Sequence, residues 1–135
     1  QVVAAIRYIT NGTYLEIMKE MLQSEVSADL KPLKARVEKL VALYEEAIDK
    51  VKADENADEH DFLGRRLYDL TANIIESLLI LDDATKAPEL FAKSANVFVR
   101  MAEEGVIGAA AYIKAFNAED LKNFIAEEET ATEEA

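Results

Sequence analysis

Hydrophobic residues recur along this chain at the spacing of amphipathic helices, and strand-like alternation is nearly absent. In four segments the apolar side chains return every three or four residues, which places them on one face of a helix. These segments are residues 14–27, 32–53, 59–83 and 88–115. Shorter helices are expected over 1–9 and 118–126. The pattern therefore predicts an all-α fold.

Turn and capping residues separate the predicted helices. Asn11-Gly12 divides the first two, because neither residue favours a helix interior. Thr13 followed by Glu16 matches a capping box at the start of the second helix. Three further residues stand at expected helix starts: Pro32, Pro88 and Asn117. Because the connections are short, we expect an up-down antiparallel four-helix bundle with short extra helices at each end.

Charge is distributed unevenly along the 135 residues. The chain has 15 Lys and Arg against 27 Asp and Glu, a formal net charge of −12. Residues 54–61 and 127–135 each contain five acids and no base, which leaves only −2 for the rest. We therefore expect a single helical bundle domain over 1–126, an acidic connection inside it, and an acidic disordered tail over 127–135.

Composition also excludes several kinds of partner. An acidic protein without a large basic patch is a poor ligand for nucleic acid or for an anionic membrane surface. No uncharged run approaches the roughly 20 residues that a membrane-spanning helix needs.

Neither end resembles a targeting signal, so we expect a cytoplasmic location. Because the first residue is Gln1 and not Met, we expect a chain that was processed or cut from a longer protein.

Metal-binding and catalytic patterns find no support in the residues. The single histidine, His60, has Ala57 three residues before it, so the Glu-x-x-His pairs of a di-iron bundle cannot form. In the acidic connection, Glu59 and Arg65 occupy the positions where a calcium loop needs Gly and Glu. The chain has no Cys and no Gly-rich phosphate loop. We therefore assign no catalytic, cofactor-binding or metal residue, and expect His60 to be a solvated surface residue.

Two neighbouring arginines have a similarly plain interpretation. Arg65 and Arg66 lie early in the third long helix, within four residues of Asp61 and Asp69. Ion pairs at that spacing stabilise a helix locally. We expect such local pairs and not an anion site.

The last long helix contains an uncharged stretch rich in small residues, from Gly105 to Ile113. Small side chains allow a second helix to approach closely. Two interpretations stay open: the segment is the central helix of the bundle, or it is a docking surface for another domain or subunit. The candidate docking residues are Gly105, Gly108, Ala109 and Tyr112.

The second half of the chain resembles a known family. The sequence RLYDLTANIIESLLILDDATKAPELFAKSANVFVRMAEEGVIGAAAYI is similar to the C-terminal helical extension that follows the catalytic core in some bacterial acyl-CoA dehydrogenases. The shared features are an aromatic-small pattern from Ala95 to Phe98, the step Arg100-Met101, and the small residues from Gly105 to Ala111. The resemblance extends over residues 14–113.

The resemblance implies a parent enzyme that uses FAD to oxidise acyl-CoA to enoyl-CoA. The flavin and catalytic elements would precede Gln1, so this fragment itself would carry no cofactor and no activity. Its expected role is packing or oligomerisation, with the catalytic core of the same chain and further copies of the protein as partners. Asn11-Gly12 faintly resembles a flavin-contacting segment of that family, but Tyr8 and Ile9 replace its Glu and Gly, so no flavin role is transferred. The alternative is a free-standing acidic helical interaction module with no enzymatic parent.

Overall fold

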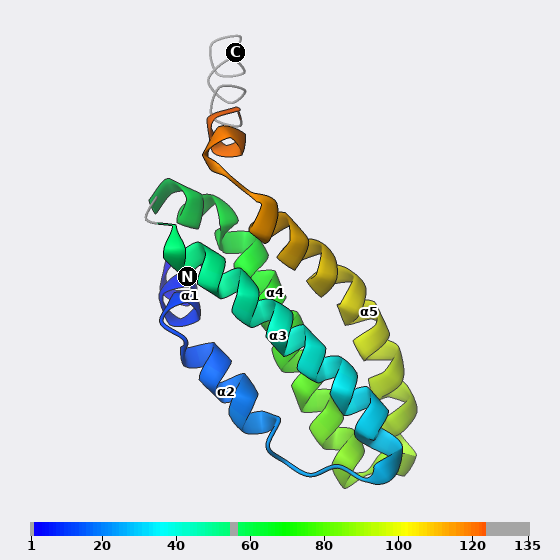
Figure 1. Cartoon of the computed structure of the whole chain (residues 1–135). Helices are drawn as coiled ribbons and strands as arrows, with labels where there is room; N and C mark the ends of the chain where they lie inside the picture. Colours follow the sequence, from blue (N-terminus) through cyan, green and yellow to red (C-terminus); the bar gives the residue numbers. More distant parts are fainter. Residues whose placement is uncertain (1, 55–56, 124–135) are drawn as a thin grey trace.

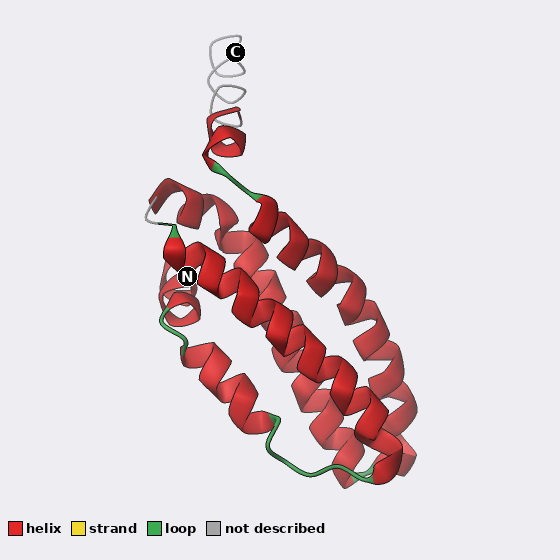
Figure 2. Cartoon of the chain, viewed as in Figure 1, coloured by secondary structure: helices red, strands yellow, loops and turns green. Residues whose placement is uncertain are grey.

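The structure, a computed structural model, describes residues 2–54 and 57–123, with side chains from Ile6 to Asp54, at His60 and from Phe62 to Asn123. Its helices are α1 (Val2–Thr10), α2 (Thr13–Met21), the 3-10 helix η1 (Ala28–Leu30), α3 (Lys31–Ala53), α4 (Ala57–Lys86) and α5 (Pro88–Ala115). Residues 118–123 are also helical. No strand occurs in this part of the chain, and the all-α prediction is confirmed (Figure 2).

The helices follow one another in an up-down order. Figure 1 shows α2, α3, α4 and α5 running in alternating directions, with α1 and residues 118–123 as the extra elements at the two ends. The pair α3 and α4 lies between α5 on one side and the short helices α1 and α2 on the other. The predicted bundle is confirmed, although its first member is shorter than expected. Helix α2 ends at Met21 and not at residue 27.

The start of α2 differs from the predicted capping box. Asn11 caps the helix: its side-chain Oδ1 accepts the backbone N–H of Thr13 at 2.9 Å and the Thr13 hydroxyl at 2.6 Å. Gly12 occupies the N-cap position with a φ of 87°, a backbone conformation that favours glycine. The pair Asn11-Gly12 therefore forms a specific turn, which explains why the chain bends here.

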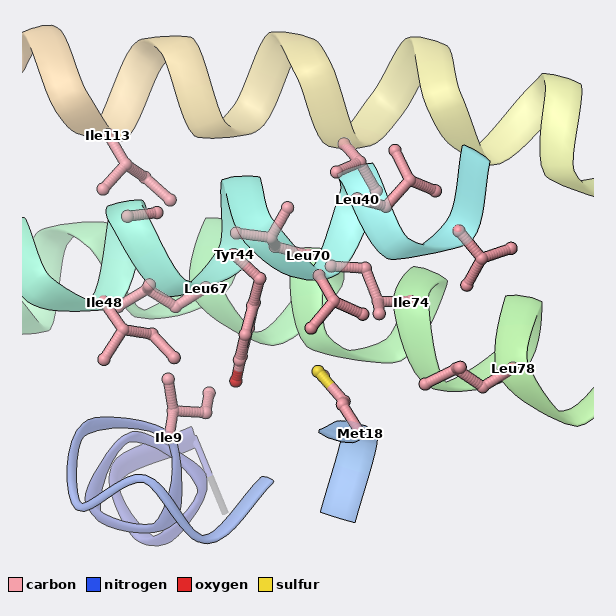
Figure 3. Close-up of a cluster of buried hydrophobic side chains, with 14 of the residues drawn as sticks. Ile9, Met18, Leu40, Tyr44, Ile48, Leu67, Leu70, Ile74, Leu78 and Ile113 are labelled. Atoms are coloured by element: carbon pink, nitrogen blue, oxygen red, sulfur yellow. The ribbon is translucent and has the colours of Figure 1, made fainter. Parts of the chain in front are cut away.

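One continuous hydrophobic core joins all the helices. Figure 3 shows Ile9 and Met18 from the short helices facing Tyr44, Ile74 and their neighbours on α3 and α4. On α5 the buried positions that face this core are Ala95, Val99, Ala102, Val106, Ala110 and Ile113. Because three of these residues are alanines that alternate with Val or Ile, α5 packs closely along both α3 and α4.

Helix α5 is not the central helix of the bundle. Within the segment from Gly105 to Ile113 only Val106, Ala110 and Ile113 are buried, while Gly105, Gly108 and Tyr112 are exposed. The apolar character of the segment therefore has two origins: one face enters the core, and the opposite face meets solvent. The first of the two interpretations made from the sequence is wrong.

The C-terminal end of the bundle agrees with the predicted caps. The side-chain oxygen of Asn117 accepts the backbone N–H groups of Glu119 and Asp120 and so caps the helix at 118–123. The expected continuation to residue 126, the tail 127–135 and most side chains of the acidic connection lie outside the described residues.

Candidate functional site

The outer face of α5 carries a second regular stripe, opposite the one that enters the core. Its members are all exposed and are separated alternately by four and three residues. We call this stripe the outer seam: Leu90, Ser94, Val97, Met101, Glu104, Gly108, Ala111 and Ala115. Leu90, Val97 and Met101 are 72%, 61% and 69% exposed. Alternating spacings of four and three are those of a helix that packs against another helix, yet no described element covers this face.

Large and small residues are separated along the outer seam. The large apolar side chains belong to its first half, whereas Gly108, Ala111 and Ala115 form most of the second. Exposed apolar residues that occur singly are ordinary on protein surfaces, but a contiguous row of them marks an interaction surface more often. The outer seam is therefore the strongest candidate for a functional surface in the described part of the chain.

The four predicted docking residues have different surroundings in the structure. Gly108 belongs to the outer seam, and a Cβ atom added there would meet nothing within 4 Å. A Cβ on Gly105 would approach only the Asn73 side chain, at an ordinary 3.7 Å. Ala109 instead packs against the core from the edge of the buried face. Neither glycine is thus required by packing within the chain.

Tyr112 is held by contacts inside the protein. The Arg66 guanidinium lies 3.8 Å from the centre of the Tyr112 ring, in a cation–π arrangement. Tyr112 also contacts Phe116, whose ring stacks on Phe62 with centroids 5.1 Å apart. This row of aromatic rings fixes Tyr112 beside the outer seam. The docking role of the four predicted residues stays a prediction.

The two arginines of α4 have different partners. Arg65 Nε lies 3.5 Å from Asp69 Oδ1, which is the local pair expected from the sequence. Arg66 instead covers Tyr112, a contact across helices that four-residue spacing on α4 does not reveal. The sequence shows that Tyr112 is present on α5, but its contact with Arg66 forms only when α4 and α5 pack together.

His60 is not the solvated residue that the sequence predicted. Its Nε2 atom is partly buried and lies 2.8 Å from the carbonyl oxygen of Val51 and 2.6 Å from that of Asp54. Both carbonyls belong to the C-terminal end of α3, where acceptors have few partners within the helix. The Val51 carbonyl also accepts the backbone N–H of Asp54 at 3.2 Å. His60 therefore acts as a side-chain cap that joins the end of α3 to the start of α4.

A shallow apolar groove lies between the short helices and α4. It encloses about 250 Å³ and is lined by Ile9, Tyr14, Tyr68, Thr71, Ala72, Ile75 and Glu76. The Thr71 hydroxyl in its wall donates to the Leu67 carbonyl at 2.7 Å and receives the Tyr44 hydroxyl. The Thr71 hydroxyl is therefore engaged within the protein, and the groove presents no convergent set of reactive side chains.

The described residues contain no group of three or more His, Cys, Asp or Glu side chains arranged to hold a metal ion. Among the helices of that same part, none is both long and apolar enough to cross a lipid bilayer. The exposed apolar surface on α5 is thus the main feature that the described residues present.

Comparisons with known proteins agree with this architecture. A profile of the family described as acyl-CoA dehydrogenase C terminal matches residues 10–121. The crystal structure of an acyl-CoA dehydrogenase family protein from Porphyromonas gingivalis is similar to this one, with a TM-score of 0.78 and 31% sequence identity. The match covers 84% of this chain and 98% of that chain. A search of the curated proteins found no match. The chain belongs to the acyl-CoA dehydrogenase C-terminal family.

Proposed function

We propose that this chain is a non-catalytic association domain of an acyl-CoA dehydrogenase-like enzyme in the cytoplasm. The parent enzyme would use FAD to oxidise acyl-CoA to enoyl-CoA, and this domain would hold parts of that enzyme together through packing or oligomerisation. The observation that carries the proposal is the outer seam, an exposed row of apolar and small residues that the bundle itself does not need.

The two residues that faintly resemble a flavin-contacting segment, Asn11 and Gly12, serve the fold. Asn11, the closest counterpart of the family's flavin-contacting segment, uses its side-chain oxygen to cap α2. Gly12 supplies the turn that precedes this helix. Both residues are thus committed to the fold, and we derive no chemical step through FAD on this domain.

The domain has the features of an independently folding unit. Its core is continuous from Ile9 in α1 to Leu121 beyond α5. The chain from P. gingivalis is covered almost completely by the match, so in that relative a chain of this size forms the structure. An association domain is expected to behave in this way, because it keeps its shape whether or not a partner is bound.

The complete reading frame that contains residues 1–135 provides the test. It should encode a flavoenzyme core, and the enzyme should be purified with and without residues 14–123. We expect both forms to show the visible absorption of bound flavin, and the truncated form to have a smaller assembly mass by light scattering. The isolated domain should be colourless and inactive toward acyl-CoA.

Two results would contradict the proposal. A reading frame without a flavoenzyme core would favour a free-standing acidic interaction module, whose partner binding should weaken with added salt. A truncated enzyme that keeps its flavin and its assembly mass but loses all turnover would indicate a catalytic contribution from this domain.

A further inference from the structure

We propose that the outer seam pairs with the outer seam of a second copy of this chain, with the two α5 helices antiparallel. This inference rests on the proposed association function and names its partner. The partner follows from the order of residues along the seam, from the charges on it, and from the length of helix available.

The seam is complementary to itself only when reversed. Its eight positions are spaced symmetrically about the point between Ala102 and Glu103. In an antiparallel pair centred there, Leu90 faces Ala115 of the other copy and Val97 faces Gly108. Leu90 and Val97 thus each meet a small residue, which gives close packing toward both ends of the helix pair.

A parallel pair would lack this fit. It would place Val97 against Val97 and Gly108 against Gly108, so the helices would be held apart at one end and leave a gap at the other. Unfilled space between packed helices loses contact energy. The separation of large from small residues therefore selects the antiparallel arrangement.

Residues beside the seam follow the same rule. Phe91 and Phe98 flank its first half, whereas Gly105 and Tyr112 flank its second half on the same side. In the antiparallel register Phe98 comes next to Gly105 of the other copy, and Phe91 comes next to Tyr112. The first pair again joins a large residue with a glycine, and the second joins two aromatic rings.

Charge complementarity supports the same register. Glu104 is the only charged member of the outer seam, and it faces Met101 of the other copy. Arg100 precedes Met101, so its guanidinium comes beside Glu104 of the partner, twice by symmetry. Within the described residues neither Arg100 nor Glu104 has an ion-pair partner. The pair would therefore satisfy both charges at the centre of the interface.

The seam is long enough for specific but modest association. From Leu90 to Ala115 the helix extends about 38 Å at 1.5 Å per residue. A single pair of helices belongs to the small end of specific interfaces, so we expect a dissociation constant of roughly micromolar size.

Sedimentation equilibrium of the purified 135-residue chain, from about 1 to 300 µM, tests the inference. We expect a monomer–dimer equilibrium that Val97→Glu weakens at least about tenfold, because it would bury an unpaired charge. Ile17→Glu is the matched control, because Ile17 is an exposed apolar residue on α2 outside the seam. It should leave the monomer–dimer equilibrium unchanged. Circular dichroism should show that both variants stay folded. A chain that is monomeric throughout the range, or a dimer insensitive to Val97→Glu, would overturn the pairing.

Cysteine cross-linking determines the direction of the helices, because the natural chain has no Cys. We expect Val97→Cys mixed with Gly108→Cys to form a disulfide-linked dimer, and Val97→Cys alone to form little. Efficient cross-linking of Val97→Cys alone would indicate parallel helices and would contradict the inference. If the isolated chain is monomeric but truncation of the parent enzyme still lowers its assembly mass, the pairing is wrong and the association function stands.

Discussion

The Tyr44 hydroxyl donates a 2.9 Å hydrogen bond to Thr71 Oγ1, and this pair joins α3 to α4 inside the core. Tyr44 is completely buried and Thr71 nearly so. Thr71 uses its own proton on the Leu67 carbonyl at 2.7 Å, which leaves its oxygen free to accept from Tyr44. A buried phenol hydroxyl is thereby satisfied without any charged group.

Because Tyr44 donates and Thr71 accepts, substitutions at these two residues should lower the free energy of unfolding by different amounts. Tyr44→Phe removes a donor and leaves the Thr71 bond to Leu67 intact, so we expect a loss of about 1 kcal/mol in the free energy of unfolding. Thr71→Val leaves the buried Tyr44 hydroxyl without its acceptor and should cost more, about 1–3 kcal/mol. Urea unfolding measures both. Exposed Tyr68→Phe is the control, and a Tyr44→Phe loss larger than that of Thr71→Val would contradict the assignment.

Tyr44 should also make stability depend on alkaline pH. Burial raises the pKa of its hydroxyl from 10.0 to about 12, because the core solvates the charged phenolate poorly. Below pH 10 the phenol is protonated in both states, so its contribution to stability is fully present. Between pH 10 and about 12 the unfolded chain loses the proton first, so the free energy of unfolding falls as pH rises.

The slope from this one group should reach at most about 1.4 kcal/mol per pH unit. Unfolding curves taken from about pH 8 to pH 11 provide the measurement, with Tyr44→Phe as the reference that removes the group. The natural chain should lose stability more steeply than the variant above pH 10. Equal slopes for the two proteins would show that Tyr44 does not titrate differently in the folded state.

The same substitution should have opposite effects at two glycines. Gly108→Ala adds a methyl group to an exposed helix position with nothing within 4 Å, and should stabilise the monomer by about 0.5–1 kcal/mol. Gly12→Ala forces a side chain into a backbone with φ of 87°, and should destabilise by about 1–2 kcal/mol. Thermal unfolding at low protein concentration, where the monomer predominates, checks both signs. Destabilisation by Gly108→Ala would mean that the helix is tighter there than the structure shows.

His60 is expected to stabilise the junction of α3 and α4. His60→Ala removes the side chain that meets the Val51 and Asp54 carbonyls, so we expect a loss of about 1 kcal/mol. Arg65→Ala, which removes an exposed ion pair, is the nearby control and should change stability by less than about 0.5 kcal/mol. Urea unfolding distinguishes the two. If His60→Ala and Arg65→Ala lower the free energy of unfolding equally, His60 does not cap α3 and the surface role predicted from the sequence is correct.

Several elements were predictable because their signals are local. Helix α3 was expected over 32–53 and occupies Lys31–Ala53, since Pro32 marks its first turn and one apolar stripe continues to its end. The end of α2 was not predictable in this way. Leu22 and Val26 still pack against the core after the helix has ended at Met21, so the apolar spacing continues although the helical hydrogen bonds do not.

For the candidate surface on α5, too, the apolar spacing alone was not sufficient to predict the structure. The sequence indicated that the region from Gly105 to Tyr112 has too many small and apolar residues for an ordinary surface helix. The spacing also predicted a core-facing stripe on this helix: Phe91, Ala95, Phe98, Ala102, Gly105, Ala109, Tyr112 and Phe116. Of that stripe, Phe91, Gly105 and Tyr112 prove to be exposed. The true buried stripe includes Val99, Val106 and Ile113, one step around the helix. Periodicity could not choose between two apolar faces of one helix.

By itself the sequence determined the helical class, the up-down order, most helix boundaries and the family resemblance, because all of these depend on local spacing, caps and composition. Only the tertiary structure decided which face of α5 the bundle covers, that Arg66 lies over Tyr112, and that His60 caps α3. Those relationships join residues far apart in the chain or on different helices. They exist only when α3, α4 and α5 pack, since burial of one apolar face is what leaves the other exposed.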